Sequence, residues 1–268
     1  MINYCQNVRK DCMAILDAPR QLVLSGAQKK IRKTAPENTF SNQIAPSLKY
    51  ITGLNTSYAA MYVSWMGLFD SFSAKNFWVP QSVKMGGIYV RNDIVGNFWD
   101  APFGLNRGII SEVNDVAFNP KPKEEDQLYI RSLNYVRVFP LDGFVAWGQK
   151  TTQVRPSAFD RVNVRRLFLR LERFSRAVLI RFIAEPNNFN TRRRVVDNLA
   201  PTFRDVLARG GLEDFQIISN ETNNPPEVRD RNELRVAVFM KPTRTAEFIL
   251  ADFVALRSDA TISFDELI

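Results

Sequence analysis

The sequence predicts an α/β (α+β) fold in which a mixed β-sheet is flanked by paired helices. Two observations indicate it: consecutive amphipathic helical segments at 161–183 and 188–209, and short β-prone segments on both sides of that pair. Helices and strands that alternate in this way bury their apolar faces against one another in layers. With 268 residues, 45% of them hydrophobic, the chain can build one large domain or two modest ones.

The first quarter of the chain is expected to hold three strands around a long polar stretch. Residues 12–18 are a short apolar run typical of a buried strand. Residues 20–57 are polar with weak periodicity, which predicts a loop with one short helix at 47–52. The segment 59–65 is β-prone, and 76–79 is expected to be its neighbour in the sheet.

A helix is expected to begin at Pro80, because proline is favoured as the first helical residue. Residues 96–108 contain three glycines and a proline, so we expect an ordered loop there. A polar helix follows at 123–132. Its acidic run Glu124 to Asp126 is expected to complement the positive end of the helix dipole rather than to bind a metal.

Two further strands are expected at 135–139 and 144–147. The turn Leu141-Asp142-Gly143 between them contains an Asp-Gly pair, which is a hairpin signal. A parallel pairing of the two strands stays open at this point.

The two long helices have the clearest periodicity. One apolar stripe runs along 161–183 at spacings of 4, 3, 4 and 4, formed by Leu167, Leu171, Phe174, Val178 and Phe182. The helix at 188–209 has its own apolar side, formed by Val195, Leu199, Phe203 and Val206. The pair Gly210-Gly211 is expected to stop it.

Three strands are predicted for the remainder of the chain, at 215–219, 233–240 and 247–256. The connection 220–228 contains Pro225-Pro226, from which we predict that it has no regular structure.

Composition argues against enzymatic chemistry. The chain has no histidine, which removes His-based triads and most zinc enzymes, and it lacks GxGxxG, GxxxxGK[ST], HExxH and CxxC motifs. Cys5 and Cys12 are expected to be small buried hydrophobes. A carboxylate-based hydrolase has no support beyond the presence of Asp and Glu. We therefore expect no catalytic residues, no cofactor and no metal, and no membrane insertion, since no apolar run approaches the roughly 18 residues of a membrane span.

Arginines crowd both predicted long helices of a chain whose net charge is +8. Three interpretations stay open: a solvated basic face, an interface with an acidic partner, and a nucleic-acid-binding surface. Phe168 and Phe174 fall at core positions, so aromatic residues that would stack on bases are missing. Crowded positive charges repel one another, which favours an acidic counter-surface. The predicted interface residues are Arg165, Arg166, Arg170, Arg173, Arg176, Arg192, Arg193 and Arg194.

The last predicted strand, 247–256, is apolar on both faces apart from Asp252, so it needs cover on both. It is either an interior strand of the chain's own sheet or an arm that adds a strand to a neighbouring subunit. The predicted arm residues are Phe248, Ile249, Leu250, Ala251, Phe253, Val254 and Leu256.

Five short segments follow one another in an order that matches a known family: 99–108 (WDAPFGLNRG), 144–151 (FVAWGQKT), 162–169 (VNVRRLFL), 220–231 (NETNNPPEVRDR) and 241–248 (KPTRTAEF). Together they resemble the C-terminal conserved region of contractile phage tail sheath proteins of the myophage type. Each motif alone is modest, and the specificity comes from their shared order over residues 59–257.

The resemblance implies a structural subunit that forms hexameric rings, stacked as a helical assembly around a tail tube. Contraction of the stack would drive the tube through the host cell envelope, which serves genome ejection. The implied partners are copies of the chain itself, the tail tube protein, and baseplate and tail terminator proteins, with no direct contact to nucleic acid. Assembly would take place in the host bacterial cytoplasm, and the product would be part of the virion. The alternative function is a basic nucleic-acid-binding module of a virus or phage.

In the family, arms from both termini add strands to the sheets of adjacent subunits, and the basic helices correspond to the inner, tube-facing region. The predicted organisation is therefore an N-terminal segment at 1–58 (the remainder of a preceding domain plus a linker), a conserved sheath core domain at 59–244 and a C-terminal arm at 245–268. Family members usually carry an N-terminal arm and additional outer domains. We expect this sequence to be the C-terminal portion of a longer sheath protein.

Overall fold

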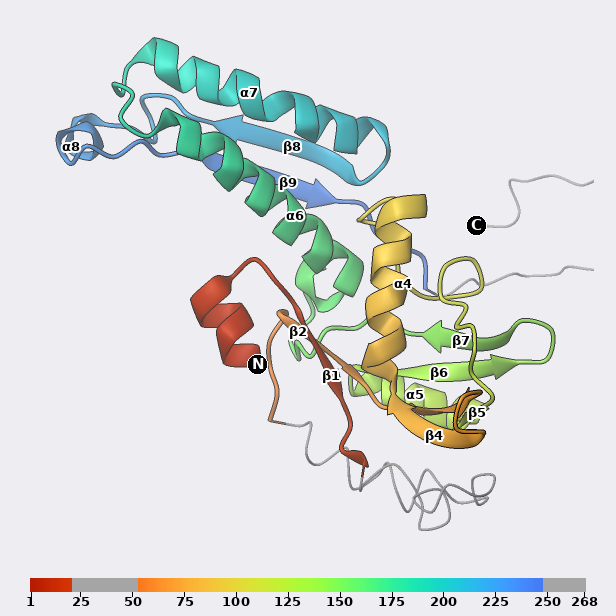
Figure 1. The fold of residues 1–268 in the computed structure, drawn as a ribbon. Helices are drawn as coiled ribbons and strands as arrows, with labels where there is room; N and C mark the ends of the chain where they lie inside the picture. The colour runs from red at the N-terminus through yellow and green to blue at the C-terminus, as the bar shows by residue number, and fades with distance from the viewer. Residues whose placement is uncertain (21–52, 248–268) are drawn as a thin grey trace, which may run out of the picture.

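A computed structural model describes residues 1–20 and 53–247 of the chain (Figure 1). The predicted helix at 47–52 and the predicted arm residues 248–256 lie outside the described residues. Figure 1 shows two parts: a lower part built on a mixed sheet, and an upper part in which two long helices accompany a strand pair.

The central sheet has four strands in the order β1 (Ala14–Asp17), β2 (Ala59–Tyr62), β6 (Leu133–Phe139) and β7 (Gly143–Trp147). The first three run parallel, and β7 returns antiparallel to β6, so the sheet is mixed as predicted. All four residues of β2 are buried, as expected for a central strand covered on both faces. The Asp-Gly turn does make a hairpin, and the parallel alternative is excluded.

A second sheet explains one error of the prediction. The segment 59–65 contains all of β2 and the first residue of another strand, β3 (Trp65–Asp70). That strand pairs antiparallel with β4 (Lys75–Pro80) and β5 (Asp115–Val116) in a separate sheet. Pro80 still pairs with Trp65, and its extended backbone makes it the N-cap rather than the first residue of α4 (Gln81–Val95).

Helix α5 (Pro122–Ile130) confirms the predicted role of the acidic run. The Glu124 carboxylate accepts a hydrogen bond from the backbone N–H of Lys121 at 2.8 Å, which closes a capping box. Glu125 also lies in the first helical turn, where the helix dipole favours negative charge.

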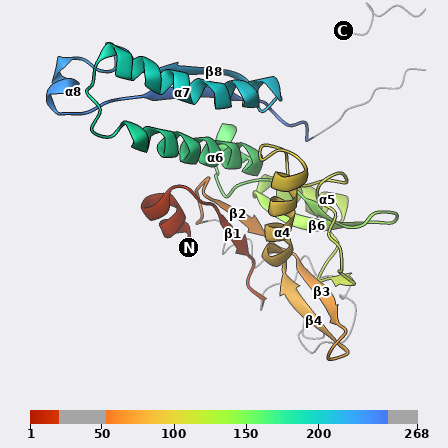
Figure 2. The same ribbon diagram turned by 45° about the horizontal axis from the view of Figure 1, so that its top comes forward.

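The upper part contains α6 (Val162–Leu179), α7 (Phe189–Ala208) and an antiparallel pair, β8 (Leu212–Ile218) and β9 (Ala237–Pro242). In Figure 2, α6 lies between α7 and the sheet of the lower part, as it does in Figure 1. Both predicted apolar stripes are confirmed, because they meet in one core with residues of β8 and β9. The described residues thus form three sheets of four, three and two strands, where a single mixed sheet was predicted.

The connection between β8 and β9 corrects a second prediction. Instead of being irregular throughout, it contains the short helix α8 (Pro226–Asp230). Pro225 is the N-cap and Pro226 opens the helix, a position where the missing N–H of proline has no partner to lose. The proline pair therefore starts a helix here rather than preventing one.

Shorter elements complete the described chain: a π-helix, η1 (Tyr4–Arg9), and two 3₁₀ turns, η3 (Ala158–Asp160) and η4 (Ile180–Phe182). Cys5 is buried and Cys12 half-buried, with 3.6 Å between their sulfur atoms, and both are free thiols. In the described ranges, no helix combines the length and apolarity needed to cross a membrane, and acidic, cysteine and histidine side chains do not gather in groups of three that could hold a metal ion.

A tyrosine pair makes the fold sensitive to alkaline pH. The hydroxyls of Tyr62, which is buried in β2, and Tyr89, which is half-buried on α4, lie 2.5 Å apart in a hydrogen bond. Burial, above all, raises the pKa of Tyr62 and raises that of Tyr89 to about 12. The folded state keeps these protons at pH values where an unfolded tyrosine, with a pKa of about 10, loses them. The stability they contribute is therefore complete below pH 10 and is lost as pH rises toward 12.

We expect the Tyr89 hydroxyl alone to lower the free energy of unfolding by about 2 kcal/mol between about pH 10 and 12, and the Tyr62 hydroxyl to act in the same direction. Urea titrations followed by circular dichroism at a series of pH values would measure it. The variant Tyr89→Phe should show a shallower decline than the parent chain. Equal slopes for the two proteins would contradict the assignment.

Gly211 gives a second test. It follows α7 and lies close to Val206 of that helix and to Trp99, which belongs to the loop after α4. A Cβ at this position would stand 2.7 Å from both the Trp99 ring and Val206 Cγ1. We expect Gly211→Ala to destabilise the fold by about 1–3 kcal/mol through overpacking. The matched change Gly87→Ala, on the exposed side of α4 with nothing within 4 Å, should leave stability unchanged or raise it. Thermal melts of both variants decide, and a Gly211→Ala protein as stable as the parent would refute this account.

Candidate interaction surface

Helices α6 and α7 carry the eight predicted interface arginines. α6 begins directly after η3, with Arg161 as its N-cap. The side-chain oxygen of Asn188 caps α7 by accepting a hydrogen bond from the backbone N–H of Thr191 at 2.9 Å. Because the apolar stripes of both helices face their shared core, the arginines lie on the remaining sides.

Arg165 is turned into the chain, with 6% of the residue exposed. Its guanidinium carbon lies 4.4 Å from the ring centroid of Tyr58 and 4.0 Å from that of Phe159, so the flat cation stacks against both rings. It also donates a hydrogen bond to the Ser57 hydroxyl. Burial lowers the pKa of Arg165. This arginine joins α6 to the segment that precedes β2.

Two more of the predicted residues are bound within the chain. Arg166 donates to Asp93 at 2.5 Å and lies over the ring of Tyr89, both on α4. Arg192, with 2% of the residue exposed, donates to Asn187 Oδ1 at 3.0 Å. For Arg165, Arg166 and Arg192, the structure therefore shows contacts inside the chain instead of the predicted external role.

The other five arginines have exposed side chains: Arg170, Arg173, Arg176, Arg193 and Arg194. The ion pairs of Arg173, Arg176, Arg193 and Arg194 within the described chain are long, from 3.5 Å for Arg194 with Glu185 to 3.8 Å for Arg176 with Glu172. Arg173 also donates a hydrogen bond to the backbone carbonyl of Asp11 at 2.9 Å. Exposed pairs of this kind contribute only about 0–1 kcal/mol each. These side chains can exchange their present partners for carboxylates of another molecule at little cost.

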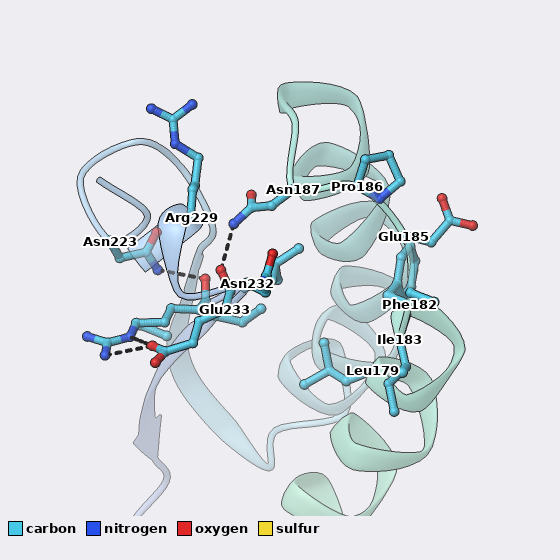
Figure 3. A pocket seen from close by; sticks show the side chains of 15 residues that line it. Leu179, Phe182, Ile183, Glu185, Pro186, Asn187, Asn223, Arg229, Asn232 and Glu233 are labelled. Carbon is cyan, nitrogen blue, oxygen red and sulfur yellow. Dashed lines mark hydrogen bonds and ion pairs between the residues drawn. The ribbon is translucent and has the colours of Figure 1, made fainter. Parts of the chain in front are cut away.

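An open groove lies at the far end of the helical layer, between the C-terminal end of α6 and the connection around α8 (Figure 3). It has a volume of about 1220 Å³. Its α6 side presents Leu179, Phe182 and Ile183, and the opposite side is the chain from 232 to 237. Asn187 bridges the two sides by donating to the carbonyl of Glu233 at 2.8 Å.

Asn224 explains why the segment NETNNPPEV has its composition. This residue is fully buried, its Oδ1 accepts a hydrogen bond from the backbone N–H of Arg235 at 2.7 Å, and its Nδ2 donates to the carbonyl of the same residue at 2.9 Å. Asn223 donates to the carbonyl of Ile218 at 2.8 Å. The asparagines therefore replace the backbone pairing that the strands lose at their connection.

The strand pair β8–β9 has open edges. Among the described residues, each of these strands pairs only with the other. One side of the pair packs on α6 and α7 through Phe215, Ile217, Val238 and Met240, and the other side exposes Phe239. Open edges present unpaired backbone N–H and C=O groups, to which a further strand can add.

Comparisons with known proteins agree with this arrangement. Residues 154–255 match the family described as phage tail sheath C-terminal domain. The chain is 34% identical to the tail sheath protein of Vibrio phage KVP40 over 98% of its length, and 32% identical to that of Enterobacteria phage T4 over 97%. Both matches cover 39% of the relative, so the chain spans about two fifths of the length of these proteins.

Solved structures show the same fold in two assemblies. A sheath complex of the PVC extracellular contractile injection system, in its contracted state, aligns with a TM-score of 0.74 and 25% identity, covering 90% of this chain and 63% of that one. The baseplate of the anti-feeding prophage aligns with a TM-score of 0.74 and 18% identity, covering 95% of this chain and 63% of that one. The α+β fold is thus a sheath fold. Residues 154–255 thus carry the phage tail sheath C-terminal domain, and nearly the whole chain is similar to tail sheath proteins of contractile phages.

Proposed function

We propose that this chain is part of a contractile sheath subunit of a phage tail, assembled as hexameric rings stacked around the tail tube. Shortening of the stack drives the tube through the host cell envelope. The observation that carries the proposal is the likeness, over 90% of the chain, to a sheath complex in the contracted state. Its partners are further copies of the subunit, the tail tube, and the baseplate and terminator proteins of the virion tail.

The open strand pair β8–β9 supports a connection between subunits through arms. A two-stranded sheet is marginal by itself and gains from further strands. In our proposal, residues 245–268 form the arm, whose segment 247–256 is apolar on both faces and pairs with the sheet of an adjacent subunit. The core domain at 59–244 is extended by β1, since this strand of the segment 1–58 pairs with β2.

The exposed arginines support contacts that change partners during contraction. A contractile sheath needs two packed arrangements, with the extended one held by a barrier. Weak, exposed ion pairs on α6 and α7 can break and form again between neighbours more readily than an apolar core can. In this proposal, Arg170, Arg173, Arg176, Arg193 and Arg194 meet acidic surfaces of the tube or of adjacent subunits.

Deletion of residues 248–268 from the full-length protein tests the arm. We expect the protein to keep its fold and to lose the ability to form tubes, because the hydrophobic clusters of the described chain are formed by residues up to Met240; circular dichroism checks the fold. Electron microscopy of the assembled material gives the result. Tubes of normal length from the truncated protein would exclude the arm as the link between rings.

Charge reversal tests the arginine surface. The triple variant Arg170→Glu, Arg173→Glu and Arg176→Glu should lose assembly, while its free energy of unfolding changes by only about 1–2 kcal/mol. It removes two long ion pairs and the hydrogen bond from Arg173 to the Asp11 carbonyl. Arg204→Glu, also exposed but outside the predicted set, serves as the control and should assemble.

Micrographs and urea titrations measure both effects. The opposite pattern would favour a nucleic-acid-binding module: intact tubes in the triple variant, with loss of a DNA affinity that falls steeply with salt concentration.

A further inference from the structure

The carboxylate of Glu247 is held by side chains from three different elements. Tyr129 of α5 donates its hydroxyl proton to Oε2 at 2.8 Å. Gln149, just after β7, donates to Oε1 at 3.2 Å, and Arg161, the N-cap of α6, donates to the same oxygen through Nε at 2.5 Å. Only 11% of the Glu247 side chain is exposed. Charge-assisted bonds of this length in a partly buried site are stronger than surface ion pairs.

The surroundings of this carboxylate are basic. Lys150 places its ammonium group 3.6 Å from the ring centroid of Tyr129, and Arg161 also donates to the Tyr129 hydroxyl at 3.0 Å. Asp160 is the other acidic side chain near the group, 3.0 Å from Arg161 Nη1. The positive charges of Lys150 and Arg161 are thus only partly balanced by Asp160 of η3, and Glu247 supplies the second negative charge.

The protonation of these groups fits a site arranged for an anion. Burial, above all, raises the pKa of Tyr129 to about 12, and its hydrogen bond to Glu247 acts in the same direction, so the hydroxyl stays a donor. Burial lowers the pKa of Lys150, and the positive charge of Arg161 adds to this effect. A carboxylate beside Lys150 offsets part of that penalty.

Glu247 lies in a stretch for which the described residues provide few other contacts. Residues 243–247 follow β9 and have no regular secondary structure. Figure 1 shows this stretch running from the end of β9 toward β7. Thr245 accepts a hydrogen bond from Asn163 Nδ2 at 3.0 Å, and the backbone N–H of Thr243 donates to the carbonyl of Gly211 at 3.4 Å. In place of a strand ladder, these few contacts determine the direction of the segment, and the bonds of Glu247 are the strongest of them.

We infer that Tyr129, Gln149, Lys150 and Arg161 form a carboxylate-binding site whose ligand is the chain's own Glu247, and that this clamp fixes where the C-terminal segment leaves the core domain. The inference rests on the proposed function in one respect: the segment it holds is the arm that joins subunits. An arm transmits force to its own subunit through its base, and the clamp ties that base to α5, to the end of β7 and to the start of α6.

Limited trypsin digestion of the full-length protein, kept unassembled, tests the clamp without reference to sheath formation. Arg244 lies within the stretch and is exposed, so cleavage after it reports how often the segment leaves the core. We expect Glu247→Gln to raise the cleavage rate at Arg244 by about tenfold or more, because proteolysis follows the population of the open form. Tyr129→Phe, which removes one donor and keeps the ring, should give a smaller increase.

Glu213→Gln is the matched control, because Glu213 pairs with Lys241 at 2.6 Å on the exposed surface of the same region. It should leave cleavage at Arg244 close to the parent rate. If Glu247→Gln and Tyr129→Phe both cleave at the rate of this control, the clamp does not exist.

Assembly of the same variants separates this inference from the proposed function. If the clamp has the proposed role, the variant Glu247→Gln, which weakens it, should form shorter or fewer tubes than the control Glu213→Gln. Normal tubes from Glu247→Gln, together with lost assembly on deletion of 248–268, would overturn the clamp's role and leave the arm intact. Normal tubes from the deletion would overturn the arm, while the digestion result would still decide whether Glu247 is bound.

Discussion

Helix α6 takes part in two hydrophobic cores at once, and the arrangement of the two parts of the molecule depends on it. Val162, at its start, packs in the cluster built around β2, α4 and β6. Leu167 and Leu171 pack with α7 and β8 in the other cluster. Because an α-helix advances only about 1.5 Å per residue, these anchors follow one another closely along a stiff rod. The strand pair β8–β9 is thereby held at a set place relative to the central sheet.

This double role also explains the two uses of arginine on one helix. The first half of α6 lies between other elements, and Arg165 is enclosed there by the rings of Tyr58 and Phe159. Its planar guanidinium can stack on apolar rings and still donate hydrogen bonds, which the ammonium group of lysine does less well. The second half of α6 has one exposed side, where Arg173 and Arg176 reach solvent and make long ion pairs, and Arg173 also donates to the Asp11 carbonyl at 2.9 Å.

Periodicity within a segment could be predicted from the sequence, and pairing between distant segments could not. The stripe that contains Leu167 and Leu171 is a local pattern, and the structure confirms it. The burial of Arg165 depends on Tyr58, more than a hundred positions away, so no local pattern marks it. The same limit explains why the strands predicted to form one sheet form three. Which strands pair with β2 and which with β3 depends on the packing of segments that are distant in the sequence.

Local chemistry was also misjudged where one residue type has two uses. The sequence predicts that Pro225 and Pro226 prevent regular structure, but proline in the first turn of a helix loses no hydrogen bond, and Pro226 opens α8. The binding of Glu247 could not be predicted from the sequence, because its hydrogen-bond donors Tyr129, Gln149 and Arg161 lie far apart in the chain. The resemblance to sheath proteins identified the family through the order of its motifs, and it could not say which arginines face outward.

The contacts of the described residues differ in strength in a way that would suit the moving sheath subunit that we propose. The cores around α6 are built on buried apolar side chains, so they resist rearrangement. At the base of the C-terminal segment, Glu247 is held by three charge-assisted or polar bonds at 2.5 to 3.2 Å, in a site that solvent barely reaches. Toward the outside, the arginine pairs lengthen and lie in water. Separating this molecule from a neighbour that shares such exposed pairs would break those pairs first, because each contributes only about 0–1 kcal/mol, and would leave the cores intact. In the proposed sheath, contacts between subunits could therefore change while each subunit keeps its fold.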